Sequence, residues 1–246
     1  TYVNGKRELI YELETSQLPP GVTGIKADRS VLLFSDGSDA DDSGNVYELD
    51  FSGQLTPASL GGKGGTIERI IKDGNRFVLG VEYSGAVPSY KFYDPDVDAA
   101  VSGMVNQFST ASVNLVSWTD DWSKLLYLIY GSDTPGSYVL QDRETGQMML
   151  VADERDNIPP DAVGQMVSVN YKARDGLNIP SILTWPAGVD IETASKLPLV
   201  VMPHGGPESY DAVGFDWMAQ YFANRGYLVL QPNFRGSSGY GTEHRI

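Results

Sequence analysis

The chain has 246 residues, of which 41% are hydrophobic, and 32 acidic against 18 basic residues give a formal charge of −14. This acidity argues against nucleic acid or an anionic membrane as a partner, because like charges repel. Cysteine is absent, which excludes disulfides and thiolate metal sites. No apolar run approaches the roughly 18–20 residues of a membrane-spanning helix, so no membrane partner is expected, and the compartment is left open.

From residue 1 to about residue 158, short strand-like runs alternate with turn signals. The runs are rich in β-branched and aromatic residues, and we identify no sustained helical period among them. The segment 8–14 is interpreted as the closing strand of a preceding unit. The other expected strands are 31–34, 46–51, 77–83, 90–93, 124–130 and 138–142.

Aspartates repeat along this region in two sets. The first set stands just before strands and the second marks later turns: Asp28, Asp73 and Asp121, then Asp50, Asp94 and Asp142. The spacings are 73 − 28 = 45 and 121 − 73 = 48 residues in the first set, and 94 − 50 = 44 and 142 − 94 = 48 in the second. A period of about 40–50 residues with four short strands per unit is typical of β-propeller blades. Three blades are visible and a ring typically needs about 4–8, so we expect further blades before Thr1 in the parent protein.

The pattern changes around residues 157–163, where we place a boundary between 1–158 and 159–246. The segments "MVSVNYKA" (166–173) and "NIPSILTWP" (178–186) alternate as strands and flank an Asp-Gly turn. This pattern predicts an antiparallel hairpin at the start of the second part.

A strand, a helix and a second strand are predicted after this hairpin. "LPLVVMP" (197–203) is a continuous apolar run that suits a strand buried on both faces, and 227–234 is a second such strand. Between them, 215–225 is predicted to be a helix that ends at Gly226. The order predicts a parallel α/β sheet led in by the hairpin. The apolar residues expected on one side of the helix are Phe215, Met218 and Phe222.

The segment "RGSSGYG" (235–241) looks like the turn that presents a serine nucleophile. That turn requires Gly-x-Ser-x-Gly, because the residues flanking the serine must be small. Centring the pattern on Ser238 puts Tyr240 where the second glycine belongs, and centring it on Ser237 puts Arg235 at the first position. Neither serine meets the requirement, so the segment is not predicted to be a nucleophile elbow.

Two motifs about thirty residues apart, "PHGGP" (203–207) and "NFRGSSGYG" (233–241), resemble the prolyl oligopeptidase family of serine peptidases. The likeness is strongest to its acylaminoacyl-peptidase and dipeptidyl-peptidase-like branches. The resemblance implies β-propeller blades followed by the N-terminal part of an α/β-hydrolase domain. It also implies a peptidase that cleaves short peptides through an acyl-enzyme.

The resemblance places the loop at 203–207 in the oxyanion hole, with the backbone N–H of Gly206 as the candidate donor. His204 and Gly205 are assigned to the same substrate-facing loop, and His204 is interpreted as a packing or substrate-binding residue. The serine, aspartate and histidine of the triad are expected beyond Ile246, so the chain alone is predicted to be inactive.

Two basic residues near the end of the chain are given structural roles. His244 stands at the start of the next helix and is interpreted as a surface or capping residue. Arg235 is interpreted as the partner of a carboxylate behind the loop.

No cofactor and no metal are expected. A calcium loop at 39–50 fits the spacing, but an acidic turn is preferred, since the flanks are strand-like and Asp50 stands where a Glu is usual. The expected partners are a short peptide substrate and the remainder of the hydrolase domain, and a homo-oligomer is left open. A non-catalytic propeller module that binds peptides or proteins is the alternative function, and a downstream Gly-x-Ser-x-Gly followed by Asp and His would separate the two.

Overall fold

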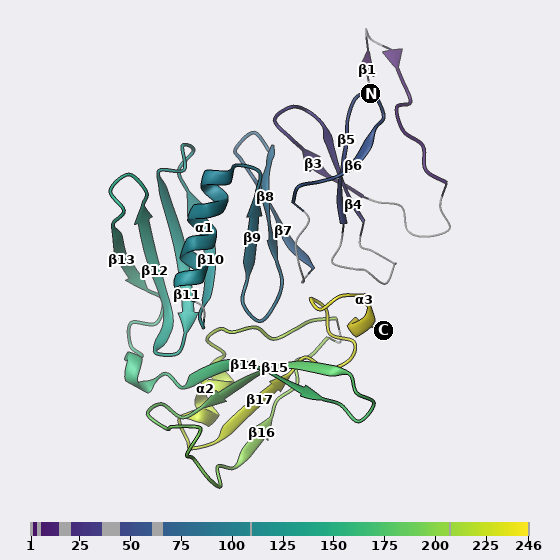
Figure 1. Cartoon of the computed structure of the whole chain (residues 1–246). Coiled ribbons are helices and arrows are strands. Elements are labelled where there is room, and N and C mark those ends of the chain that lie inside the picture. The colour runs from purple at the N-terminus through teal and green to yellow at the C-terminus, as the bar shows by residue number, and fades with distance from the viewer. Residues whose placement is uncertain are drawn as a thin grey trace.

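Three antiparallel sheets stand side by side, and a fourth, mixed sheet lies at one end of them (Figure 1). Residues 39–44, which include most of the ligands considered for calcium, lie outside the described part of the chain. The computed structural model describes residues 2–3, 6–14, 21–35, 45–60, 66–108, 110–206 and 208–245.

Each antiparallel sheet uses strands that are consecutive in the chain, as expected for repeated units. The first contains β3 (Gly21–Ile25), β4 (Val31–Ser35), β5 (Asn45–Leu49) and β6 (Leu55–Pro57). The second contains β7 (Ile67–Lys72), β8 (Val78–Tyr83) and β9 (Ser89–Phe92). The third contains β10 (Ser112–Trp118), β11 (Lys124–Gly131), β12 (Thr134–Asp142) and β13 (Met148–Asp153), and a hairpin of β1 (Tyr2–Val3) and β2 (Lys6–Arg7) precedes them all.

The six repeated aspartates hold turns. Each accepts hydrogen bonds from backbone N–H groups two to four residues further along the chain. A short carboxylate side chain can replace a backbone acceptor in this way. Within the first set of turns, one residue takes a left-handed conformation in each, with φ of 70° at Arg29, 70° at Arg76 and 59° at Trp122. The periodicity in the sequence is therefore a periodicity of turn geometry.

Helix α1 (Pro95–Gln107) corrects the expectation that the first 158 residues contain no helix. Asp94 caps it by accepting from the N–H groups of Asp96 and Val97, and Pro95 opens its first turn. The buried residues of α1 repeat at helical spacing and pack between the second and third sheets: Val97, Val101 and Met104. Since α1 follows β9, the second sheet has three strands instead of the expected four.

Residues 8–14 form no strand, so the interpretation of this segment as a closing strand was wrong. Its leucines lie open to solvent, with Leu9 78% and Leu13 48% exposed. A strand needs a neighbouring strand to pair its backbone, and the described part of the chain offers this segment none.

The mixed sheet has the order β14-β15-β17-β16. The predicted hairpin is confirmed, with an unbroken antiparallel register and Gly176 at φ 89° in its turn. β16 and β17 are parallel, and β15 pairs antiparallel with β17, which is the arrangement predicted for the second part. The strands are β14 (Gln165–Lys172), β15 (Asn178–Trp185), β16 (Leu199–Val201) and β17 (Leu228–Pro232), preceded by a short 3-10 turn, Pro160–Ala162.

Strand β16 is not buried on both faces. It lies at the edge of the mixed sheet, and Leu199 and Val201 are 53% and 55% exposed. The apolar side chains of β16 therefore form a surface that is not covered by any residue the structure describes.

Helix α2 (Trp217–Ala223) is shorter than predicted and turns a different face to the sheet. Its buried residues are Ala219, Gln220 and Ala223, whereas Met218 is 39% exposed. Small alanines let the helix approach closely, and the Gln220 side chain exchanges hydrogen bonds with the backbone of Gly164 at 2.6 and 3.3 Å. Gly226, at φ 88°, ends the helix as predicted.

The antiparallel sheets meet the mixed sheet through the loop between β8 and β9. Ala86 and Val87 pack against an apolar cluster of the second part. The carbonyl of Ala86 accepts from the N–H of Val213 at 2.7 Å, and the hydroxyl of Ser84 donates to the carbonyl of Gly239 at 3.1 Å.

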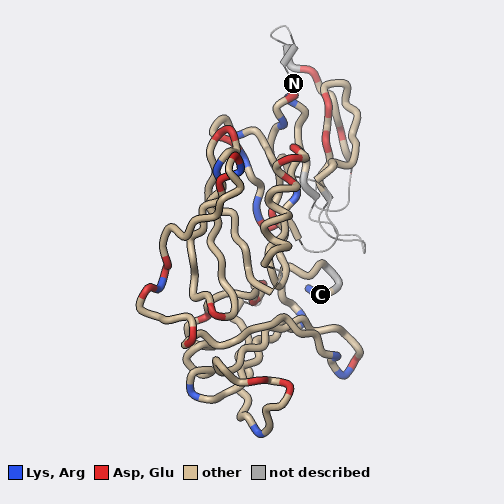
Figure 2. The backbone as a smooth tube through the Cα atoms, turned by 60° about the vertical axis from the view of Figure 1, so that its left-hand side comes forward, with Lys and Arg blue, Asp and Glu red and all other residues tan. Residues whose placement is uncertain are grey.

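Acidic residues are spread over the loops at both ends of the molecule (Figure 2). Among the described residues, none of the helices is long and apolar enough to cross a membrane.

Candidate functional site

The loop at 203–206 leaves the carboxyl end of β16. Gly206 has φ 136°, and a Cβ there would lie 2.9 Å from the backbone nitrogen of Glu208 and 3.3 Å from that of Ser209. A side chain at Gly206 would therefore strain the backbone and collide with it. Gly205 differs, because a Cβ there would meet nothing within 4 Å.

The imidazole of His204 fastens this loop. Its ring stacks on Phe234 with centroids 4.6 Å apart, and it contacts the carbonyl of Gly205 through Nδ1 and the hydroxyl of Ser237 through Nε2, both at 2.8 Å. A carbonyl only accepts, so Nδ1 carries a proton and donates to Gly205. In the neutral ring Nε2 then accepts from Ser237, and one side chain joins the two glycine-rich motifs.

Ser237 does not behave as a nucleophile. Its side chain is fully buried, at 0% exposure, so no substrate carbonyl can reach it. The second ring nitrogen of its partner His204 donates to a backbone carbonyl and not to a carboxylate. This serine–histidine pair lacks the third group that orients a catalytic base.

Asn233 organises the second motif. It is completely buried, and its amide oxygen accepts from the N–H of Asp211 at 2.6 Å. Its amide nitrogen donates to the carbonyl of Asp211 at 2.8 Å and to the hydroxyl of Tyr240 at 2.9 Å. The strand end is thereby tied to the segment that follows the candidate loop.

A cavity of about 250 Å³ lies beside His204 and contains Asp211 and Asp216. Burial raises the pKa of Asp211, the nearby His204 opposes that rise and Asp216 adds to it. Oδ2 of Asp211 is buried and has no hydrogen-bond partner among the described residues. The carboxylate of Asp216 has hydrogen-bond partners, since its Oδ1 caps α2 by accepting from the N–H groups of Met218 and Ala219, both at 2.8 Å.

The structural roles interpreted from the sequence for two basic residues near the end of the chain had different outcomes. Arg235 forms an ion pair with Asp175 in the β14–β15 turn, as the sequence suggested. His244 lies in α3 (Thr242–Arg245), which agrees with the predicted helix start, but it is only 6% exposed and is not a surface residue. Its Nε2 lies 2.8 Å from the carbonyl oxygen of Asn233, which explains its burial. Among the described ranges, no group of acidic and histidine side chains could hold a metal ion.

The chain is similar to several known proteins. Residues 213–245 match the prolyl oligopeptidase family. Dipeptidyl peptidase family member 6 of Caenorhabditis elegans is 30% identical over 156 residues, which are 56% of this chain and 21% of that protein. The chain is related to the prolyl oligopeptidase family. This is the resemblance that the two motifs indicated.

A second curated relative and a solved structure are also similar to this chain. The acylamino-acid-releasing enzyme of Sus scrofa is 37% identical over 68 residues, covering 28% of this chain and 9% of that protein. The fold is similar to that of a Mycobacterium tuberculosis puromycin-hydrolyzing peptidase, with a TM-score of 0.61, 21% identity, and coverage of 93% of this chain and 35% of that chain. The chain thus spans about a fifth of the first curated relative and about a third of the solved structure.

His204, Gly205 and Gly206 lie in one loop and their predicted roles stay predictions, whereas the sequence analysis missed Asn233 and Asp211. Asn233 directly precedes "FRG" and follows the last residue of β17, which is a local signal for a polar residue at a strand end. Nothing in the spacing indicates that its partner lies 22 residues earlier.

Proposed function

We propose that this chain supplies the oxyanion loop of a serine peptidase that cleaves short peptides through an acyl-enzyme. One observation carries the proposal. The N–H of Gly206 is on an exposed loop at the end of β16 and has no hydrogen-bond partner among the described residues. A fixed and unoccupied donor is what a developing oxyanion requires.

In this mechanism a serine hydroxyl attacks the peptide carbonyl, and negative charge forms on the carbonyl oxygen. The N–H of Gly206 donates to that oxygen and lowers the barrier, while His204 keeps the donor in place through Phe234 and Ser237. Collapse of the intermediate expels the amine, and water then releases the acyl group from the serine. The nucleophile, the base and its orienting carboxylate belong to parts of the whole protein outside residues 1–246.

We assign residues 1–158 to propeller blades and residues 159–246 to the start of an α/β-hydrolase domain. The apolar edge strand β16, with Leu199 and Val201 exposed, suits a surface covered by the remainder of that domain. The blades would limit entry to short peptides. The period of the aspartate turns and the parallel pairing of β16 with β17 support this division.

The matched pair Gly206→Ala and Gly205→Ala, made in the whole protein, tests the assignment. At Gly206 a Cβ would collide with the backbone and displace the N–H. Gly206→Ala should therefore lower kcat on a short peptide by about a hundredfold, the effect of losing one oxyanion donor. Gly205→Ala should leave kcat nearly unchanged, because its Cβ enters open space. Equal effects of the two substitutions would refute the role given to Gly206.

A second measurement separates the peptidase from a binding module. The chain of 246 residues alone should not hydrolyse aminoacyl or acyl-aminoacyl chromogenic substrates, whereas the whole protein should. Hydrolysis by the purified chain would contradict the placement of the nucleophile. A whole protein that binds peptides without cleaving them would favour the non-catalytic alternative.

A further inference from the structure

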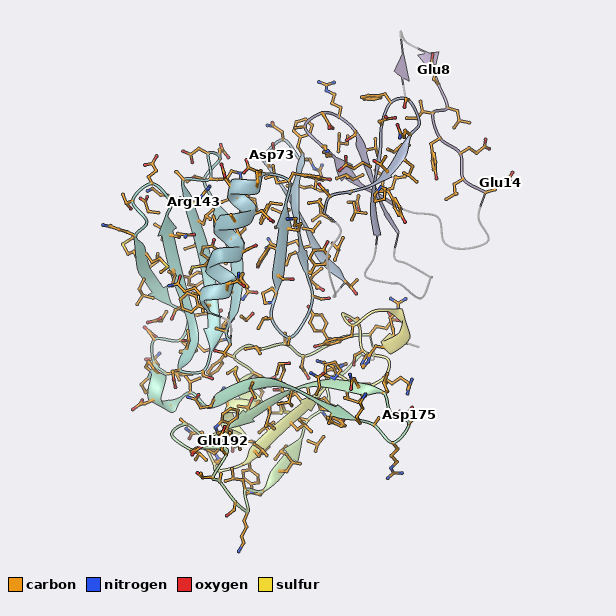
Figure 3. All side chains as sticks on the ribbon, in the orientation of Figure 1. Glu8, Glu14, Asp73, Arg143, Asp175 and Glu192 are labelled. Atoms are coloured by element: carbon orange, nitrogen blue, oxygen red, sulfur yellow. The ribbon has the colours of Figure 1, made fainter. Side chains whose placement is uncertain are left out.

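Two adjoining cavities open at the end of the antiparallel sheets that lies away from the mixed sheet. Asp73 marks this end in Figure 3, whereas Asp175 and Glu192 mark the mixed sheet. One cavity has a volume of about 300 Å³ and the other about 560 Å³. Leu79 and Trp122 belong to the walls of both, so a single elongated ligand could extend from one to the other. No residue of the proposed peptidase site lines either cavity.

The walls contain an aromatic platform. Trp118 and Trp122 stack with centroids 5.0 Å apart and planes within 3°. Phe92 meets Trp122 edge-on at 5.4 Å and extends the apolar surface into the smaller cavity. Stacked indoles offer a flat, electron-rich face, which attracts organic cations more strongly than other aromatic side chains do.

Carboxylates surround this platform. Asp73 and Asp120 line the larger cavity, and Asp28 and Asp94 line the smaller one. Asp120 has no hydrogen bond or ion pair with any residue that the structure describes. Hydrogen bonds from Ser30 hold the pKa of Asp28 below its ordinary value, so this carboxylate is charged at neutral pH.

Two basic side chains at or beside the cavities, those of Lys26 and Arg143, are already engaged. Lys26 is the only lysine or arginine among the described residues that line the two cavities, and its Nζ lies 2.8 Å from Glu48 and 3.4 Å from Asp28. Arg143, next to Trp122, donates to the backbone carbonyls of Trp122 and Asp96 at 3.0 and 3.3 Å. The cavities therefore keep an excess of negative charge.

Lys26 itself shows how a cation is held here. Its ammonium lies 4.6 Å from the centre of the Tyr93 ring while it pairs with a carboxylate. An aromatic face and a carboxylate together replace the water that an ammonium loses. Trp118, Trp122 and Asp120 offer the same two groups in the larger cavity, and no lysine or arginine is among the described residues that line it.

We propose that the larger cavity binds an ammonium or guanidinium group, and that the apolar stem of this ligand runs past Leu79 and Trp122 into the smaller cavity. The ligand is an alkyl amine or the lysine or arginine side chain of a peptide. The four carboxylates disfavour an anion, and a neutral apolar ligand would leave Asp120 without a partner among the described residues.

Calorimetric titration of the chain with four probes tests the proposal. Nα-acetyl-lysine-N-methylamide represents a peptide and pentylamine a free amine, while Nα-acetyl-norleucine-N-methylamide keeps the stem without the charge. Ethylamine keeps the charge with a short stem. We expect both long cations to bind saturably, norleucine to bind about tenfold more weakly or not at all, and ethylamine to lose about fourfold for each missing buried methylene. Binding by only one of the two long cations would identify the source of the natural ligand.

A pair of variants separates local recognition from overall charge. Asp120→Asn should weaken the lysine probe by about fivefold. Asp161→Asn, an exposed position on the 3-10 turn before the mixed sheet, removes the same charge far from the cavities and should leave binding unchanged. Asp120 holds no described hydrogen bond, so folding should survive its replacement, and circular dichroism checks this.

Three results would overturn the proposal. They are norleucine binding as tightly as lysine, Asp120→Asn and Asp161→Asn having the same effect on binding, and neither long cation binding saturably at accessible concentrations. Any one of them would show that the cavities are ordinary gaps between neighbouring sheets.

Discussion

The aspartate turns of the antiparallel sheets and the Asn233 network of the mixed sheet use the same bond, a side-chain oxygen accepting from a backbone N–H. They differ in reach and in burial. The aspartate bonds span two to four residues near the surface, whereas Asn233 is fully buried and reaches Asp211, 22 residues away. A local turn can form by itself, but a buried network is satisfied only when all its members are present. The two regions should therefore respond very differently to the loss of one side chain.

The largest effect is expected for Asn233→Ala. It leaves the N–H and the carbonyl of Asp211 and the hydroxyl of Tyr240 without a partner, and each unsatisfied buried group costs about 1–3 kcal/mol. We expect unfolding free energy in urea to fall by about 3 kcal/mol or more. Asn233→Asp keeps the acceptor for the N–H of Asp211 but loses both N–H donors and buries a charge, so it should restore none of the lost stability. A loss below about 1 kcal/mol would mean that the network is not cooperative.

Disrupting a single local turn should lower the free energy of unfolding by a smaller amount. Asp94→Ala removes the cap of α1 and should lower the free energy of unfolding by about 1 kcal/mol. Asp94→Asn retains an acceptor at the same place and should be nearly neutral. The comparison between the regions fails if Asp94→Ala destabilises the chain as much as Asn233→Ala.

A stabilising change is expected at Asp211. Burial raises the pKa of this carboxyl, so above its ordinary value of 3.8 the unfolded chain ionises more readily than the folded one, and the resulting penalty grows as pH rises toward the folded pKa. Asp211→Asn removes that penalty and should raise Tm at about pH 7 but not near pH 3. Asp161→Asn is exposed and serves as the control. A rise that is the same at both pH values would point to packing and not to charge.

The smallest effect is expected for Arg235→Gln. Arg235 pairs with Asp175 across 60 residues of sequence, yet their side chains are 46% and 59% exposed. Solvent screens such a pair, so the urea midpoint should not change measurably at physiological salt. A clear loss here would show that distance along the chain, and not burial, sets the energy of these contacts.

The sequence predicted those parts of the fold that depend on short-range geometry. The aspartate period, the Asp-Gly hairpin and the Gly226 helix end are each encoded within a few residues. Helix α1 was also encoded, in the Asp94-Pro95 start and the spacing of Val97, Val101 and Met104, but its polar positions and its place among strands hid the period. The burial of β16 could not be read from its apolar sequence, because an edge strand and a central strand can be equally apolar.

The candidate loop was predicted only in part. The motif located His204, Gly205 and Gly206, and their assigned chemistry remains a prediction. Their fastening depends on Ser237 and Phe234, which meet His204 from another segment. No local pattern distinguishes a serine that anchors a histidine from one on the surface, so this pair required the fold.

The contact between Ser84 and Gly239 has a consequence for the order of folding. It spans 155 residues, far more than any strand pairing in the sheets. Closing so long a loop costs entropy that short-range pairs do not, so contacts of this kind form late. During synthesis the β8–β9 hairpin leaves the ribosome long before its partner exists. The final alignment of the glycine-rich segment is therefore a docking step between pieces that have already folded.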